Sequence, residues 1–77
     1  MNWINLDSPS LIRMAYDEEQ QVLTVQYTTG KYYEFFKVTP VQFEEMKENK
    51  YPGRYLTEQI RSHCRYEHMP YIAVGDL

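Results

Sequence analysis

Alternating apolar and polar positions predict two neighbouring β-strands in the first third of the chain. Residues 11–16 and 22–27 each place an apolar side chain at every second position. The apolar positions are Ile12, Met14, Tyr16, Leu23, Val25 and Tyr27. A period of two is typical of a strand that buries one face. The polar residues 17–20 connect the two runs, so the pattern predicts an antiparallel pair over a core.

A third strand follows a turn that contains Gly30, and the length of the loop decides which side chains this strand buries. A two-residue turn would place Glu34 opposite Val25, on the apolar face. A three-residue loop over residues 28–30, with Gly30 in the left-handed conformation, places Tyr33 there instead. A slip of one residue moves every side chain to the other face. The apolar face is preserved only by the three-residue loop, which is therefore our prediction.

This register divides the aromatic side chains of the third strand between its two faces. It pairs Leu23 with Phe35 on the core side and leaves Tyr32 and Phe36 on the other side. Two helices can cover only one face of the sheet, so Tyr32 and Phe36 are expected on an open face. There they could stack on a base, form a subunit interface, or be covered by the Trp3-Ile4 segment or the apolar C-terminal tail.

Two helices are predicted after the strands. The first begins with Thr39 as its N-cap, Pro40 in its first position and Gln42 completing a capping box, and it ends before Pro52-Gly53. The second is expected from about residue 54 or 55 to about residue 66, with Thr57 as an alternative, later N-cap. Its inner face would carry Leu56, Ile60, His63 and Cys64, and its opposite face Arg54, Glu58, Arg61 and Arg65.

These elements predict an α+β fold, a three-stranded antiparallel meander followed by two helices packed on one face of the sheet. The 77 residues are expected to form a single domain with a core at about residues 8–66, an N-terminal lead at 1–7 and an apolar tail at 67–77. A core of this size is only just large enough to fold alone, so a homo-oligomer is expected. Residues 1–7 lack the features of a signal peptide or a membrane span, and a single cysteine fits a reducing compartment, so we expect a cytoplasmic protein with no membrane contact.

The charge of the chain limits the partners that it can bind. The formal net charge is −3, which argues against binding long duplex DNA. The only local basic candidate is formed by Arg54, Arg61 and Arg65. These arginines could be a solvated helix face paired with Glu58, or they could recognise phosphate, with Gly53 allowing a close approach of the backbone.

Residues suited to catalysis or metal binding are few. His63, Cys64 and His68 are the only soft ligands, and their spacing is not that of a zinc site. A Cys64–His68 pair has no accompanying carboxylate or oxyanion feature, and no glycine-rich phosphate loop occurs. We therefore expect neither an enzyme nor a bound metal or cofactor.

Short motifs along residues 8–66 resemble the KTSC domain, named for its occurrence at the C-terminus of some lysyl-tRNA synthetases. The early motif residues are Ser10-Leu11 and Ala15-Tyr16-Asp17, the central ones Gly30, Tyr33, Phe35 and Val38, and the later ones Gly53, Tyr55, Ile60 and Arg61. The chain departs from the family pattern at Phe35, where Tyr is usual, at Thr39, where Pro is usual, and at Tyr51, where a small residue is usual. The resemblance implies the fold; RNA binding is only suggested by the synthetase context.

Two functional hypotheses follow. The first is a non-catalytic binding module for a nucleotide-type phosphorylated ligand or a short RNA, which could act by sequestering that ligand. Its expected ligand-binding residues are Arg54, Tyr55, Arg61, Arg65, Tyr32 and Phe36. The alternative is a self-associating or partner-binding adaptor that uses the open sheet face and the apolar tail and takes no small ligand.

Overall fold

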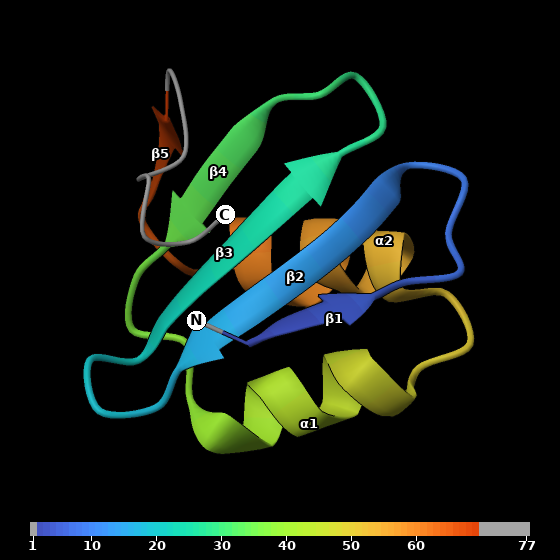
Figure 1. Cartoon of the computed structure of the whole chain (residues 1–77). Coiled ribbons are helices and arrows are strands. Elements are labelled where there is room, and N and C mark those ends of the chain that lie inside the picture. Colours follow the sequence, from blue (N-terminus) through green and yellow to red (C-terminus); the bar gives the residue numbers. More distant parts are fainter. Residues whose placement is uncertain (1, 70–77) are drawn as a thin grey trace.

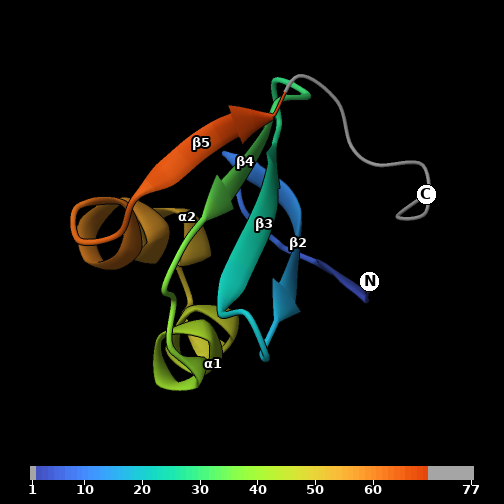
Figure 2. The same ribbon diagram turned by 90° about the vertical axis from the view of Figure 1, so that its left-hand side faces the viewer.

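Residues 2–69, which the computed structural model describes, form an antiparallel sheet with two helices on one of its faces (Figure 1). The strands are β1 (Trp3–Asn5), β2 (Leu11–Asp17), β3 (Val22–Tyr27), β4 (Tyr32–Phe35) and β5 (Tyr66–Met69), in the spatial order β1-β2-β3-β4-β5. The helices are α1 (Pro40–Glu48) and α2 (Pro52–Tyr55), and α2 continues directly into the π-helical segment η1 (Leu56–Arg61). Seen along the sheet, both helices lie on the same side (Figure 2). The predicted α+β class with helices on one face is confirmed.

The predicted number of strands is wrong, because the structure adds a strand at each edge of the predicted meander. The lead at residues 1–7 provides β1, which places Ile4 opposite Met14 of β2. The segment after the second helix provides β5, which places His68 opposite Tyr33 of β4. A sheet edge presents unpaired N–H and C=O groups, and even short segments with no clear alternation can satisfy them. The rest of the predicted tail, from residue 70 onward, lies outside the described residues.

The predicted register between β3 and β4 is confirmed. Val25 lies opposite Tyr33, and the Tyr27 N–H donates to the Lys31 carbonyl at 2.9 Å, which closes a loop of residues 28–30. Gly30 has a φ of 93°, a conformation that side chains disfavour. The turn therefore fixes which aromatic residues face the helices.

The predicted burial of Ile12 is wrong. A β-bulge separates the pair Leu11–Tyr27 from the pair Arg13–Gln26, so Ile12 is an extra residue on β2. Leu11 is 1% exposed and Ile12 is 39% exposed. The bulge thus moves Leu11 into the core position that simple alternation assigned to its neighbour.

The start of α1 is as predicted. The Thr39 side chain accepts from the Gln42 N–H, the Gln42 side chain accepts from the Thr39 N–H, and Pro40 occupies the first turn. The inner side of α1 places the Phe43 ring on the Tyr16 ring, with 4.5 Å between the ring centroids. The capping box and this stacked pair hold α1 against the sheet.

The second helix starts earlier and ends earlier than predicted. It begins at Pro52 and ends at Arg61, and residues 62–65 lead into β5. The Ile60 carbonyl accepts from both the His63 and the Cys64 N–H groups, at 3.1 and 2.8 Å, and this closes the last turn. His63 is therefore exposed rather than on the inner face, whereas Cys64 is half-buried against the core.

The core lies between the sheet and the helices. Its fully buried side chains are Leu11, Met14, Leu23, Val25, Phe35, Val38, Met46, Leu56 and Ile60. Within residues 2–69, no helix has the length and apolar character needed to cross a membrane.

Candidate ligand-binding site

The three arginines that were predicted to share one helix face lie in three different surroundings. Arg54 lies in the first turn of the second helix. Arg61 lies at its end, with its guanidinium 5.0 Å from the centroid of the Tyr66 ring. Arg65 lies beyond the helix, with its guanidinium 4.5 Å from the centroid of the Phe36 ring. Because the helix ends at Arg61, these side chains do not form one continuous stripe.

The sheet face opposite the helices is partly covered at Tyr32 by β1. The Trp3 and Tyr32 rings meet edge to face with 6.1 Å between centroids. Arg13 binds both: its guanidinium lies 4.1 Å from the Trp3 ring centroid, and its Nη2 donates to the Tyr32 hydroxyl at 2.9 Å. The Trp3 segment therefore contacts Tyr32, as one of the alternatives predicted, and the C-terminal tail from residue 70 lies outside the described residues. Phe36 lies past the end of β4 and is not part of this cluster.

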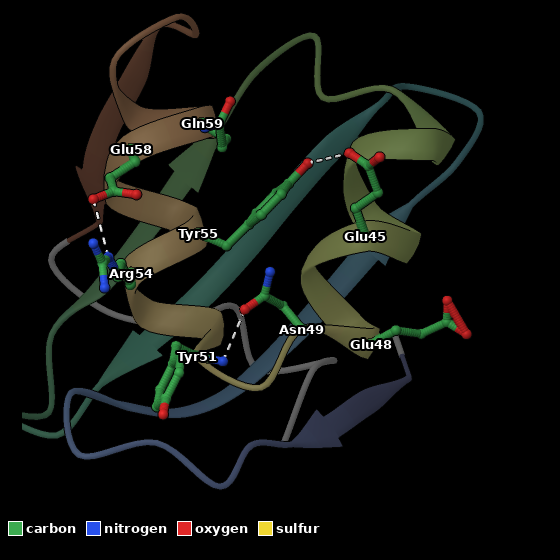
Figure 3. A pocket seen from close by; sticks show the side chains of 8 residues that line it. All are labelled: Glu45, Glu48, Asn49, Tyr51, Arg54, Tyr55, Glu58 and Gln59. Atoms are coloured by element: carbon green, nitrogen blue, oxygen red, sulfur yellow. Dashed lines mark hydrogen bonds and ion pairs between the residues drawn. The ribbon is translucent and has the colours of Figure 1, made fainter.

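A hollow of about 680 Å³ lies between α1 and the second helix (Figure 3). Its lining residues are Glu45, Glu48, Asn49, Tyr51, Arg54, Tyr55, Glu58 and Gln59. The Tyr55 hydroxyl donates to Glu45 Oε1 at 2.6 Å, and Arg54 Nε lies 3.1 Å from Glu58 Oε2. Three carboxylates face one already paired guanidinium, so this hollow repels an anion.

Burial and the neighbouring Glu45 together raise the pKa of Tyr55. Burial of the phenol, together with its hydrogen bond to Glu45 and the charge of that carboxylate, raises the pKa of Tyr55 to about 12. The phenol is thus held in its neutral, donating form. Tyr55 faces the acidic hollow. It is therefore not placed to contact a phosphate, which was the role expected for it together with the arginines.

A second hollow, of about 510 Å³, lies between the loop that precedes β2 and the start of α2. Its lining residues are Asp7, Ser8, Pro9, Ser10, Lys50, Tyr51, Pro52, Gly53 and Arg54. Two cations therefore face one carboxylate, and two hydroxyl groups lie beside them. This combination suits an anion that accepts several hydrogen bonds.

Gly53 is what allows the two segments to meet. A Cβ at residue 53 would overlap the Ser10 hydroxyl and would lie 3.1 Å from Ser8 Oγ. Ser8 Oγ in turn accepts from the Ser10 and Leu11 N–H groups at 3.2 and 3.3 Å. Because Ser8 Oγ already accepts twice from the backbone, its own proton is directed to Ser10 Oγ at 3.4 Å, and the Ser10 hydroxyl keeps a proton to donate to a ligand oxygen.

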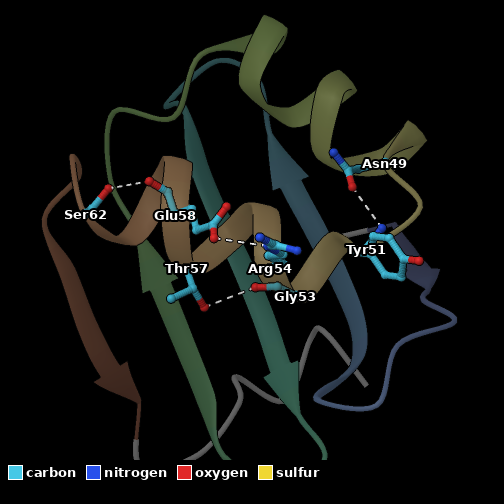
Figure 4. Close-up of polar contacts among 7 residues, drawn as sticks. All are labelled: Asn49, Tyr51, Gly53, Arg54, Thr57, Glu58 and Ser62. Atoms are coloured by element: carbon cyan, nitrogen blue, oxygen red, sulfur yellow. Dashed lines mark hydrogen bonds and ion pairs between the residues drawn. The ribbon is translucent and has the colours of Figure 1, made fainter.

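The start of the second helix is ordered by short-range hydrogen bonds (Figure 4). The Tyr51 N–H donates to Asn49 Oδ1 at 2.8 Å, and the Thr57 hydroxyl donates to the Gly53 carbonyl at 3.1 Å. Thr57 is therefore inside the helix and is not its N-cap. Tyr51 is 58% exposed and lines both the second hollow and the acidic one, with the Lys50 ammonium 5.7 Å from the centroid of its ring.

The sequence prediction included Arg54 and the close approach at Gly53 but missed Ser8, Ser10 and Lys50. The two serines precede Gly53 by more than forty positions, and no spacing rule connects them. The available signals were a Pro-Gly pair at a helix start and the unusual Tyr51 beside it. Within the described part of the chain, no group of three His, Cys, Asp or Glu side chains is arranged to hold a metal ion.

Comparison with known proteins gives consistent matches. The family model described as the KTSC domain matches residues 7–66. An uncharacterized protein of Stutzerimonas stutzeri is 33% identical over 67 residues, which cover 86% of this chain and 94% of that protein. A lysine–tRNA ligase of Nostoc punctiforme is 26% identical over 57 residues, which cover 74% of this chain but only 10% of the ligase.

The fold is also found among solved structures. The crystal structure of a KTSC domain protein from Yersinia pestis superposes with a TM-score of 0.83 at 15% sequence identity, covering 88% of this chain and 96% of the other. At that identity the likeness concerns the fold alone.

Proposed function

The chain belongs to the KTSC domain family, and from this premise we propose that it is a non-catalytic binding module for a nucleotide-type phosphorylated ligand or a short RNA. The observation that carries the proposal is the hollow in which the Ser8 and Ser10 hydroxyls, Lys50 and Arg54 gather around Gly53. We call this hollow the Gly53 site.

The chemistry of the Gly53 site supports a phosphate. Ammonium and guanidinium groups donate strong hydrogen bonds to phosphate oxygens, and hydroxyl groups complete the shell. Lys50 and Arg54 outnumber Asp7, so the lining carries a net positive charge in a chain whose formal net charge is −3. Arg54 would exchange its ion pair with Glu58 for the ligand, because that pair is exposed and weak.

A base has a place beside the phosphate. The exposed Tyr51 ring lies at the edge of the site, and a ring of this kind stacks on any base. The volume of about 510 Å³ lies within the usual range for small-molecule sites. The similarity to part of a lysine–tRNA ligase supports a ligand drawn from nucleotides or RNA, since that enzyme is named for a tRNA substrate. Such a site would act by retaining its ligand.

The other expected ligand-binding residues contribute to this proposal unequally. Arg54 is central to it, and Arg61 lies further along the same helix. Tyr55 faces carboxylates, Tyr32 is engaged by Arg13, and Arg65 lies near Glu67 at 3.5 Å. We therefore assign the phosphate to Arg54 and its neighbours. A nucleotide or RNA ligand, like the unpaired Cys64, fits a cytoplasmic protein.

Self-association is the second candidate function. β1 and β5 are the edge strands of the sheet, and β5 is largely exposed. An exposed edge strand can pair with another copy of the chain or with a partner strand. Sedimentation equilibrium across a range of protein concentrations tests this; a monomer at all concentrations rules out the homo-oligomer.

The ligand proposal is tested by calorimetry with nucleoside mono-, di- and triphosphates and with short single-stranded RNA. We expect Arg54→Gln, Lys50→Gln and Ser10→Ala each to weaken binding. The matched control is Arg65→Gln, which removes the same charge outside the Gly53 site. Equal losses in Arg54→Gln and Arg65→Gln would show a general charge effect, and no binding by the parent protein would end the proposal.

A further inference from the structure

A third, smaller hollow lies where the end of η1 meets the turn between β3 and β4. Its volume is about 250 Å³, and its lining residues are Tyr27, Thr29, Lys31, Tyr33 and Arg61. We call it the Arg61 site. Among residues 2–69, this lining consists of two cations and three hydroxyl-bearing side chains, and it contains no carboxylate. That composition stands out in a chain with more acidic than basic residues.

Tyr27 in the Arg61 site and Tyr66 beside it both hydrogen-bond the Arg61 guanidinium. The Tyr27 and Tyr33 rings meet edge to face with 5.3 Å between centroids, and Tyr33 lies 6.1 Å from Tyr66. The hydrogen bond and charge interaction with Tyr66 raise the pKa of Arg61. A cation fixed in this way loses little conformational freedom when it binds an anion.

The Arg61 site and the Gly53 site lie along one side of the molecule and are joined by the loop at residues 28–30. The Thr28 N–H donates to the Ser10 carbonyl at 3.0 Å, which brings this loop against the serines of the Gly53 site. The adjacent Thr29 lines the Arg61 site. Along the second helix, Arg61 follows Gly53 by eight positions, which corresponds to at most about 12 Å of helix axis at the α-helical rise and to somewhat less because η1 is π-helical.

We propose that the Arg61 site holds a second phosphate of the ligand bound at the Gly53 site, and that this ligand is a short single-stranded RNA. The inference rests on the proposed function. The phosphates of a nucleoside triphosphate are linked through single oxygen atoms and cannot span this separation. Successive phosphates of a single strand are separated by a whole ribose, so a strand of a few nucleotides can bridge the two sites.

Lys31 supplies the second cation of the Arg61 site. Lys31 is exposed on the loop side of the Arg61 site, opposite the helix that carries Arg61. Two cations from different elements would therefore contact one phosphate from two directions. A planar guanidinium gives paired hydrogen bonds, and the ammonium adds a point charge.

The experiment measures affinity against ligand length, using oligouridylates of one to six nucleotides in calorimetry at fixed salt. We expect affinity to rise in a step of about tenfold within the first few nucleotides in the parent protein, once the strand is long enough to reach both sites. Lys31→Gln and Arg61→Gln should each remove most of this step, judged by the ratio of six-nucleotide to one-nucleotide affinity. Lys47→Gln, which lies outside both sites, is the control and should keep the step.

The outcomes separate this inference from the proposed function. Binding of the mononucleotide without a length step would overturn the second phosphate site and leave the Gly53 site standing. A step that survives in both Lys31→Gln and Arg61→Gln would also overturn it. Binding of no oligouridylate at any length would reject the proposed function for RNA, and the second site with it. Because Lys31 is an exposed loop residue, its variant remains informative even if Arg61→Gln fails to fold.

Discussion

The backbone of Gly53 lies against the Ser10 hydroxyl with no room for a side chain between them. The contact joins the loop before β2 to the start of the second helix. It also gathers the hydroxyls and cations of the Gly53 site, so a small change here should act on binding more than on folding.

We expect Gly53→Ala to weaken nucleotide binding about tenfold while changing the free energy of unfolding by less than about 1 kcal/mol. Alanine favours the helix by up to about 1 kcal/mol relative to glycine, which offsets the cost of displacing Ser10. Urea denaturation and calorimetry measure the two effects. The double variant Gly53→Ala with Ser10→Ala should be more stable than Gly53→Ala alone; equal stabilities would contradict the close contact.

The turn between β3 and β4 gives a prediction on folding alone. Gly30 has a φ of 93°, and a Cβ there would meet nothing within 4 Å. Gly30→Val should therefore cost about 1–3 kcal/mol through backbone strain and not through a clash. Thermal unfolding measures the loss, with Thr29→Val in the same loop as control. A Gly30→Val protein that melts with the parent would show that the turn tolerates a side chain.

The sequence was sufficient to predict the hairpin register and the first helix because both depend on local rules. A one-residue slip would have buried Glu34, and the Thr39 capping box has an unambiguous pattern. The bulge at Ile12 was not predictable in this way, since an extra residue in a strand leaves the apolar content of the segment unchanged. Helical periodicity likewise continued past Arg61 in the sequence, although the closing turn at Ile60 ends the helix there.

The edge strands and the Gly53 site depend on contacts between distant segments. β1 has three residues and β5 has four, too few to show a period. Ser8 and Ser10 lie beside Gly53 only in the folded chain. Arg54 could be predicted as a candidate from its charge alone. Identifying the residues that surround it required the tertiary structure.

The cluster at β1 gives a prediction with a spectroscopic readout. Arg13 lies on the Trp3 ring and also donates to Gln26 Oε1 at 2.9 Å and to the Tyr32 hydroxyl. Arg13→Met keeps the aliphatic stem but loses the cation–π contact and both hydrogen bonds, so we expect a cost of about 1–2 kcal/mol. Trp3 is the only tryptophan, and its fluorescence should shift as the ring changes its surroundings. An unchanged spectrum and melting point would mean that Arg13 does not hold β1.

Alkaline pH should destabilise the fold partly through Tyr55. Its pKa is raised from 10.0 to about 12, first by burial and then by Glu45, so the folded state holds the phenolic proton more tightly than the unfolded state does. The resulting stabilisation is complete below pH 10 and is lost as the pH rises towards 12. Tyr55→Phe should therefore flatten the fall in unfolding free energy between pH 9 and about 11.5. Urea denaturation at several pH values measures it, and parallel curves for parent and variant would contradict the prediction.

The exposed Tyr51 ring allows the base to be tested separately from the phosphate. If Tyr51 stacks on a base at the edge of the Gly53 site, Tyr51→Ala should weaken nucleotide binding by about 1–3 kcal/mol. Tyr51→Phe keeps the ring and should bind within about twofold of the parent. Inorganic triphosphate has no base, so its affinity should be much less sensitive to Tyr51→Ala than that of a nucleoside triphosphate. Because the ring is 58% exposed, neither change should shift the free energy of unfolding by more than about 0.5 kcal/mol. If Tyr51→Ala weakens the binding of both ligands equally, Tyr51 acts through the shape of the site and does not stack on a base. If the binding of neither ligand weakens, Tyr51 is not part of the site.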